Sequence, residues 1–143
     1  MNASLPEFRR LPYPLASLVH FVIFAVVFML FFGRKPGVFR QDFITSLAPD
    51  FYSHVSNLSI SYILYATAGY VCLLAGAKMR LIVLIGLLLI LINVTYEYLI
   101  PLLNTRDPVD AIYGVGGTLL AFIVLAGIDR FGLFDTPNGS TTT

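Results

Sequence analysis

The stretch LIVLIGLLLILI, residues 81–92, decides the fold because every residue in it is apolar or glycine. It lies within an apolar run over residues 81–100. About 20 helical residues, at a rise of roughly 1.5 Å each, cross the ~30 Å hydrocarbon core of a bilayer. A lone strand would leave its backbone groups unpaired in lipid, so the run predicts a membrane-spanning helix.

Three similar runs extend this interpretation to most of the chain. The predicted spans cover residues 15–32, 55–75, 81–100 and 109–128. The composition agrees: the chain is 57% hydrophobic and 12% charged, whereas a soluble domain carries about 25% charge. Short connections make neighbouring spans antiparallel, so the predicted fold class is all-α, an integral membrane four-helix up-down bundle.

The remaining segments complete the predicted organisation. Residues 1–14 form an N-terminal cytoplasmic segment, residues 15–130 the membrane domain, and residues 131–143 a flexible tail. An interfacial helix is expected around residues 41–47. No small-residue cleavage site follows the first span, so we expect it to be retained rather than removed as a signal peptide.

The nine Lys and Arg residues predict the orientation. Five lie near the side that holds both termini and four near the opposite side. Positive residues favour the cytoplasmic side, so both termini are predicted to be cytoplasmic, with the chain in a bacterial inner membrane.

Charge and cysteine content exclude several classes of protein. A net charge of +1 gives no basic surface for nucleic acid. Cys72 is the only cysteine, so no internal disulfide can form. No HExxH sequence or other ligand cluster points to a metal or a cofactor, so neither is expected. Membrane lipid and other membrane proteins are the expected partners.

Polar groups gather where the third span ends and the fourth begins, within YEYLIPLLNTRDPVDAIYGVGG, residues 96–117. Asn93 and Glu97 are four residues apart and share a helical face. Arg106 lies in the connection, and Asp110 opens the fourth span, where the helix dipole favours a carboxylate. We expect Asp107 to be a solvated loop acid.

The second span contributes a matching polar stripe at the same membrane face. His54 and Asn57 begin it, and Asp50, four residues before His54, extends it if the helix starts early. The candidate binding residues are therefore Asp50, His54, Asn57, Asn93, Glu97, Arg106 and Asp110. The alternative is structural: charges at span ends commonly reach water, and Glu97 with Arg106 can lock two spans together.

Small residues on the fourth span have a packing explanation. Gly114, Gly117 and Ala121 follow Asp110 at four, seven and eleven residues and lie on one face. Helices in lipid associate by close contact, which small residues permit. We expect this stripe to pack against another span.

The order Glu97, Arg106, Asp110, Gly114, Gly117 resembles the closing half of the VanZ-like membrane protein family, a group named for teicoplanin resistance. Asp50 and His54 resemble an earlier motif of that family. The match covers residues 50–126, about half of the chain. Three positions depart from the family pattern: Phe51 replaces a lysine, Ile100 a polar residue and Tyr113 an asparagine. The resemblance implies an integral membrane protein of the cell envelope with a link to antibiotic resistance.

Three functions remain open from the sequence. A binding protein would hold a polar or anionic head group of a cell-envelope lipid or glycan precursor at the outer face, with Arg106 and His54 as donors. A small membrane enzyme would use His54 with Asp50 as an oriented base and Glu97 as an acid; no catalytic residue is assigned. A structural or assembly subunit would use the phenylalanine-rich first span as a partner surface.

Overall fold

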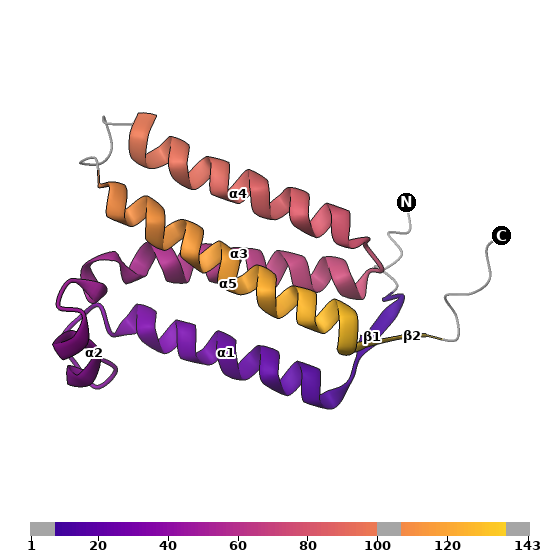
Figure 1. The fold of residues 1–143 in the computed structure, drawn as a ribbon. Coiled ribbons are helices and arrows are strands. Elements are labelled where there is room, and N and C mark those ends of the chain that lie inside the picture. The colour runs from indigo at the N-terminus through magenta and orange to yellow at the C-terminus, as the bar shows by residue number, and fades with distance from the viewer. Residues whose placement is uncertain (1–7, 100–106, 137–143) are drawn as a thin grey trace, which may run out of the picture.

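Four long helices dominate the computed structural model, which describes residues 8–99 and 107–136 (Figure 1). They are α1 (Pro14–Phe32), α3 (Phe51–Leu74), α4 (Met79–Leu99) and α5 (Pro108–Phe131). All four are long and apolar enough to cross a membrane. The all-α, four-span prediction is therefore confirmed, with each helix within a few residues of its predicted bounds.

A short helix, α2 (Asp42–Leu47), lies between α1 and α3. It confirms the helix expected around residues 41–47. We call the end of the bundle that carries it the α2 end; α3 and α5 begin there (Figure 1).

Two short strands close the opposite end, which we call the sheet end (Figure 1). β1 (Arg10–Pro12) pairs antiparallel with β2 (Leu133–Asp135). An ion pair supports the sheet, with Nη1 of Arg10 at 3.0 Å from Oδ1 of Asp129. The prediction of a flexible tail over residues 131–143 is wrong for residues 133–135, because the chain ends satisfy each other's backbone groups there. Residues 137–143 lie outside the described part.

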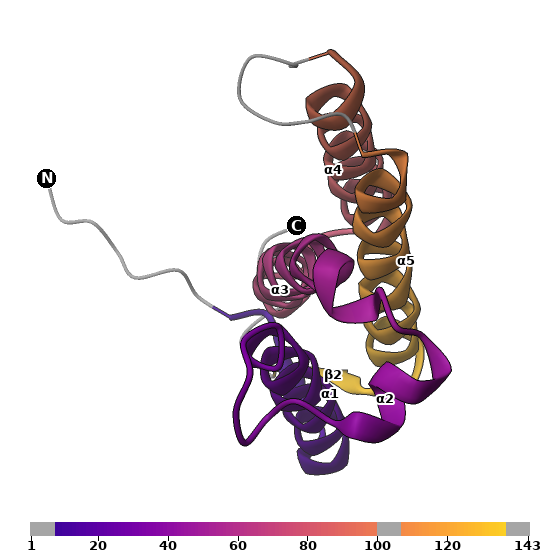
Figure 2. The same ribbon diagram turned by 90° about the vertical axis from the view of Figure 1, so that its left-hand side faces the viewer.

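The four long helices do not lie side by side in chain order: α3 and α5 form a central pair, with α1 and α4 on the outside (Figure 2). α3 and α5 form the most extensive helix contact; α1 packs mainly on α3, and α4 on α5 and α3. Within the most apolar window of each helix, 39% of residues are buried in α3 and α5 but only 11% in α1 and α4. The outer faces of α1 and α4 are therefore the main surfaces offered to lipid.

Small residues bring the central helices together, as predicted. Gly114, Gly117 and Ala121 are all buried. A Cβ atom at Gly117 would collide with the backbone carbonyl of Leu58 on α3. The stripe is therefore where α5 meets its neighbours, in keeping with the role of small residues in membrane helix packing.

Hydrogen bonds join α3 to both outer helices. The Tyr65 hydroxyl donates to the carbonyl of Ile82 on α4 at 2.7 Å. The Ser59 hydroxyl donates to the carbonyl of Val27 on α1 at 3.3 Å. Such bonds between membrane helices contribute about 0.6 kcal/mol each on average, so α3 is the element through which the others are held in register.

Candidate functional site

The α2 end brings together a histidine from α3 and two aspartates from the start of α5. Nδ1 of His54 lies 2.8 Å from Oδ1 of Asp110 and 3.5 Å from Oδ2 of Asp107. We call these three residues the His54 cluster. It joins two spans that are 56 positions apart at this contact.

The local sequence explains how α5 presents both carboxylates. Asp107 is the N-cap residue, and its Oδ1 accepts a hydrogen bond from the Val109 amide at 2.9 Å. Pro108 occupies the first helical position, where its missing N–H costs nothing. Asp110 follows in the first turn, where the positive end of the helix dipole favours an anion.

The cluster is partly open to its surroundings. The exposed fraction of the side chain is 15% for His54, 19% for Asp110 and 36% for Asp107. Two carboxylates face one imidazole, so the three groups together carry negative charge whether the histidine is neutral or protonated. An arrangement of this kind favours cations and hydrogen-bond donors over bare anions.

Aromatic rings border the imidazole. The Tyr113 ring centroid lies 5.4 Å from that of His54, and Phe51 lies 5.9 Å from Tyr113. The rings of Phe51 and Tyr113 thus give the site an aromatic wall.

The contact with Asp110 orients the imidazole. When Nδ1–H donates to the carboxylate, Nε2 is left to accept a hydrogen bond, or to donate one once protonated. A carboxylate-oriented imidazole can also move a proton. Cys72 offers no nucleophile to it, because 18 residues along α3 correspond to about 27 Å.

Of the acids expected at the same face as His54, Asp110 lies in contact with it. Asp50 was expected on the same helical face if the helix began early enough, and as the partner of His54 in the enzyme alternative; it is exposed at the N-cap position of α3 and makes no side-chain cap. Within the described part of the chain, the acids that His54 contacts are on α5. Asp107, expected to be a solvated loop acid, instead caps α5 and belongs to the cluster; the Asp-Pro order at a helix start could have revealed it.

Asn93 pairs with Ser61 rather than with the cluster. Asn93 donates from Nδ2 to the Ser61 hydroxyl at 3.0 Å. Ser61 is seven residues beyond His54, about 10 Å deeper along α3, so this pair joins α3 to α4. Asn57 is half-buried on α3.

Glu97 is 6% exposed on α4 and has an interaction partner. Its burial fits the structural alternative for this residue, a carboxylate held within the bundle. Arg106 and Ile100 lie outside the described residues, so the predicted role of Arg106 as an anion donor stays a prediction.

The cluster has the composition of a cation site. Its three ligand atoms all lie within 4.8 Å of one another. Both distances from Nδ1 are shorter than twice a metal–ligand bond of about 2.1 Å, which is the widest separation of two ligands on one ion. Imidazole with carboxylates suits Zn²⁺ or Mn²⁺ among common divalent ions.

Searches against family models, curated proteins and solved structures find no match to this chain. Membership of the VanZ-like family therefore stays a prediction from residues 50–126. What the structure establishes by itself is a protein with four helices able to span a membrane and a polar His54 cluster at one end of the two central helices.

Proposed function

We propose that this protein is a membrane protein that binds the polar head group of a lipid or lipid-linked glycan precursor at the His54 cluster. The observation that carries the proposal is the 2.8 Å contact between His54 and Asp110 at the membrane-surface ends of two spans. Ionisable groups placed there and partly shielded from water commonly serve a site.

The charge of the cluster supports a more specific class of head group than the sequence suggested. Its surplus carboxylate favours hydroxyl or ammonium donors, as in a sugar or an ethanolamine, and His54 adds an acceptor at Nε2. The anionic head group also expected from the sequence would rely on Arg106, which the described part of the chain does not include.

An apolar hollow beside the site supports a lipid rather than a soluble ligand. It has a volume of about 490 Å³ and is formed by Val94 of α4 with Pro108, Ala111, Ile112 and Val115 of α5. Pro108 and Ala111 are the chain neighbours of Asp107 and Asp110. A ligand with its head group at the cluster would therefore have an apolar surface near by for a hydrocarbon chain.

Lipid binding by single-residue variants tests the proposal. The probes are phosphatidylethanolamine, a glucosyl diacylglycerol and phosphatidic acid, the last of which has neither an ammonium group nor sugar hydroxyls. We expect the protein to prefer the first two in native mass spectrometry. His54→Gln and Asp110→Asn should each weaken this binding about tenfold or more, because a hydrogen bond to a charged group is worth roughly 1.5–3 kcal/mol.

Asp42→Asn is the matched control. Asp42 is an exposed acid on α2 at the same end of the bundle, so its loss changes the net charge of this face without touching the cluster. Equal losses in all three variants, or no loss in either cluster variant, would reject the head-group site.

A divalent cation is the second candidate ligand, favoured by the spacing of the three ligand atoms. Titration of the protein in detergent with Zn²⁺ or Mn²⁺ alone tests it. A site on the cluster should give one ion per chain, lost in His54→Gln. Binding that persists in that variant would place the ion elsewhere.

The family and location follow as further parts of the proposal. The VanZ-like resemblance over residues 50–126 and the lysine and arginine distribution support a bacterial inner membrane protein of the cell envelope with both termini in the cytoplasm. In that orientation the His54 cluster faces the outer leaflet, where envelope precursors are exposed.

A further inference from the structure

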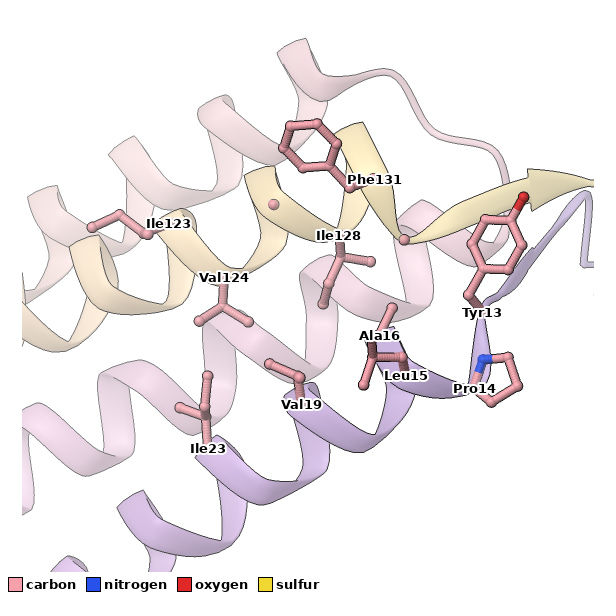
Figure 3. Close-up of a pocket in the computed structure, with 12 residues that line it drawn as sticks. Tyr13, Pro14, Leu15, Ala16, Val19, Ile23, Ile123, Val124, Ile128 and Phe131 are labelled. Atoms are coloured by element: carbon pink, nitrogen blue, oxygen red, sulfur yellow. The ribbon is translucent and has the colours of Figure 1, made fainter.

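A second apolar site lies far from the His54 cluster, between α1 and α5 at the sheet end. It is a groove of about 760 Å³ (Figure 3). Val19 and Ile23 of α1 face Val124 and Ile128 of α5 across it (Figure 3). We call it the α1–α5 groove.

α1 and α5 have little contact with each other, and they come close together where they meet the sheet. At that point Gly132 lies so close to Ala16 that an added Cβ would come within 2.7 Å of the alanine Cβ. Farther along, Gly127 leaves open space, with nothing within 4 Å of an added Cβ. Apolar walls in the hydrocarbon layer hold no water, so a hydrophobic group fills this space.

The length of the groove indicates the occupant. On α1 its lining extends from Pro14 to Ile23, and on α5 from Ile123 to Phe131. The nine and eight residue steps between these ends correspond to about 14 and 12 Å of helix. These lengths are close to half of a ~30 Å hydrocarbon core, the depth of one leaflet.

Positive charge lies at the mouth of the groove. Arg130, in the last turn of α5, is exposed, and its guanidinium carbon lies 5.3 Å from the ring centroid of Phe131, a lining residue. Arg10 is paired with Asp129 and Asp135. Arg130, by contrast, forms no ion pair with any residue in the described ranges 8–99 and 107–136.

We infer that the α1–α5 groove binds one acyl chain of an anionic phospholipid from the leaflet at the sheet end, with the phosphate facing Arg130. The groove supplies the apolar surface and the length of one leaflet, and the arginine supplies the charge. This lipid is separate from the ligand proposed for the His54 cluster at the other end.

Filling the groove from its floor tests the acyl-chain site. Gly127→Leu places a side chain in the open space, and Gly116→Leu is the matched control. Gly116 is also on α5, is also open around its Cβ and lies outside the groove. We expect native mass spectrometry with phosphatidylglycerol to show about tenfold less bound lipid for Gly127→Leu and no change for the control. Val19→Phe fills the groove from α1 and repeats the test if Gly127→Leu does not fold.

Removing the positive charge of Arg130 tests whether the lipid phosphate binds at this end of the groove. Arg130→Gln should lower the preference for phosphatidylglycerol over phosphatidylcholine about fivefold, since one arginine near an anionic surface is worth roughly 1 kcal/mol. Arg80→Gln, an exposed arginine at the start of α4, should leave it unchanged.

Two outcomes would overturn the inference. Unchanged lipid binding in both groove-filling variants would place the lipid elsewhere. A loss of dimer rather than of lipid in those variants would show that the groove holds a second copy of the chain. His54→Gln should leave phosphatidylglycerol bound, so the failure of either proposal is distinguishable from that of the other.

Discussion

Gly117 marks the closest approach of the two central helices. A methyl group there meets the backbone carbonyl of Leu58, which cannot rotate away as a side chain can. One turn earlier on the same stripe, Gly114 faces Asn93, whose amide would be only 2.9 Å from an added Cβ. The two glycines therefore fix how α5 lies against both α3 and α4.

Gly117→Ala is expected to destabilise the protein by about 1–3 kcal/mol, as overpacking of a tight contact does. The measurement is the melting temperature in detergent. Gly116→Ala is the control, because an added Cβ there meets nothing within 4 Å and alanine is the better helix former by roughly 1 kcal/mol. Equal melting temperatures for the two variants would show that α3 and α5 do not approach as closely as described.

His54 shows which contacts of a single residue can be predicted from the sequence and which cannot. Spacing along one helix correctly grouped the small residues of α5 on a single packed face. The sequence placed His54 and Asp110 at the same membrane face, where the structure brings them into contact, but it could not tell Asp110 from Asp50 as the partner of His54. Which faces of two helices meet depends on their relative rotation, and periodicity within each helix does not contain it.

Among the elements, α3 has the most varied role. It carries His54 at one end and then a series of hydroxyl groups that bond to α1 and α4. In the Ser61–Asn93 bond between α3 and α4 both partners are side chains, so both ends of it can be removed by mutation.

A double-mutant cycle on Ser61→Ala and Asn93→Leu should give a coupling energy of about 0.6 kcal/mol, and no more than roughly 1.7, because the unfolded chain in a membrane also finds polar partners. Unfolding in detergent measures the four free energies. Ser61→Ala with Leu91→Ala, an exposed residue of α4, should show no coupling. Equal coupling in both cycles would mean that the effect does not arise from the hydrogen bond.

Element boundaries were predictable for the spans and not for the strands. A bilayer of fixed thickness sets a span length, so hydropathy alone located α1, α3, α4 and α5. RLP and LFD are only three residues each. They form a sheet because the two segments meet in space, and neither segment has the alternation of apolar and polar residues that predicts a strand.

At the scale of the whole molecule, the sheet ties the first described residues to the last. The Thr136 amide donates to the carbonyl of Arg9 at 3.0 Å, and the Arg9 amide donates to the carbonyl of Leu74 at 3.0 Å. Together with β1 and β2, these bonds hold the N-terminal segment against the ends of α3 and α5.

Deleting residues 133–143 should expose this segment without removing any span. We expect trypsin to cleave after Arg9 and Arg10 faster in this variant, because the strand partner and Thr136 are lost. A chain lacking only residues 137–143 retains both and is the control. Cleavage at the same rate in the two chains would show that β2 does not protect β1.

The proposed orientation makes a second prediction for the whole molecule. In a Cys72→Ala background, Val38→Cys lies at the α2 end, where Val38 is 90% exposed, and Lys78→Cys lies in the turn before α4 at the sheet end. A membrane-impermeant maleimide should label the first from outside intact cells and the second only after permeabilisation. The reverse pattern would invert the proposed orientation.

The pairing of β1 with β2 also restricts the number of membrane crossings. Two strands that share hydrogen bonds lie on one side of the bilayer, so the chain between them crosses an even number of times. The sheet can therefore form when the chain crosses the bilayer two or four times, and it cannot form when the chain crosses three times. A variant in which one span fails to insert would lose the contact between Arg10 and Asp135, which makes the smallest element of the protein a reporter on the insertion of the largest ones.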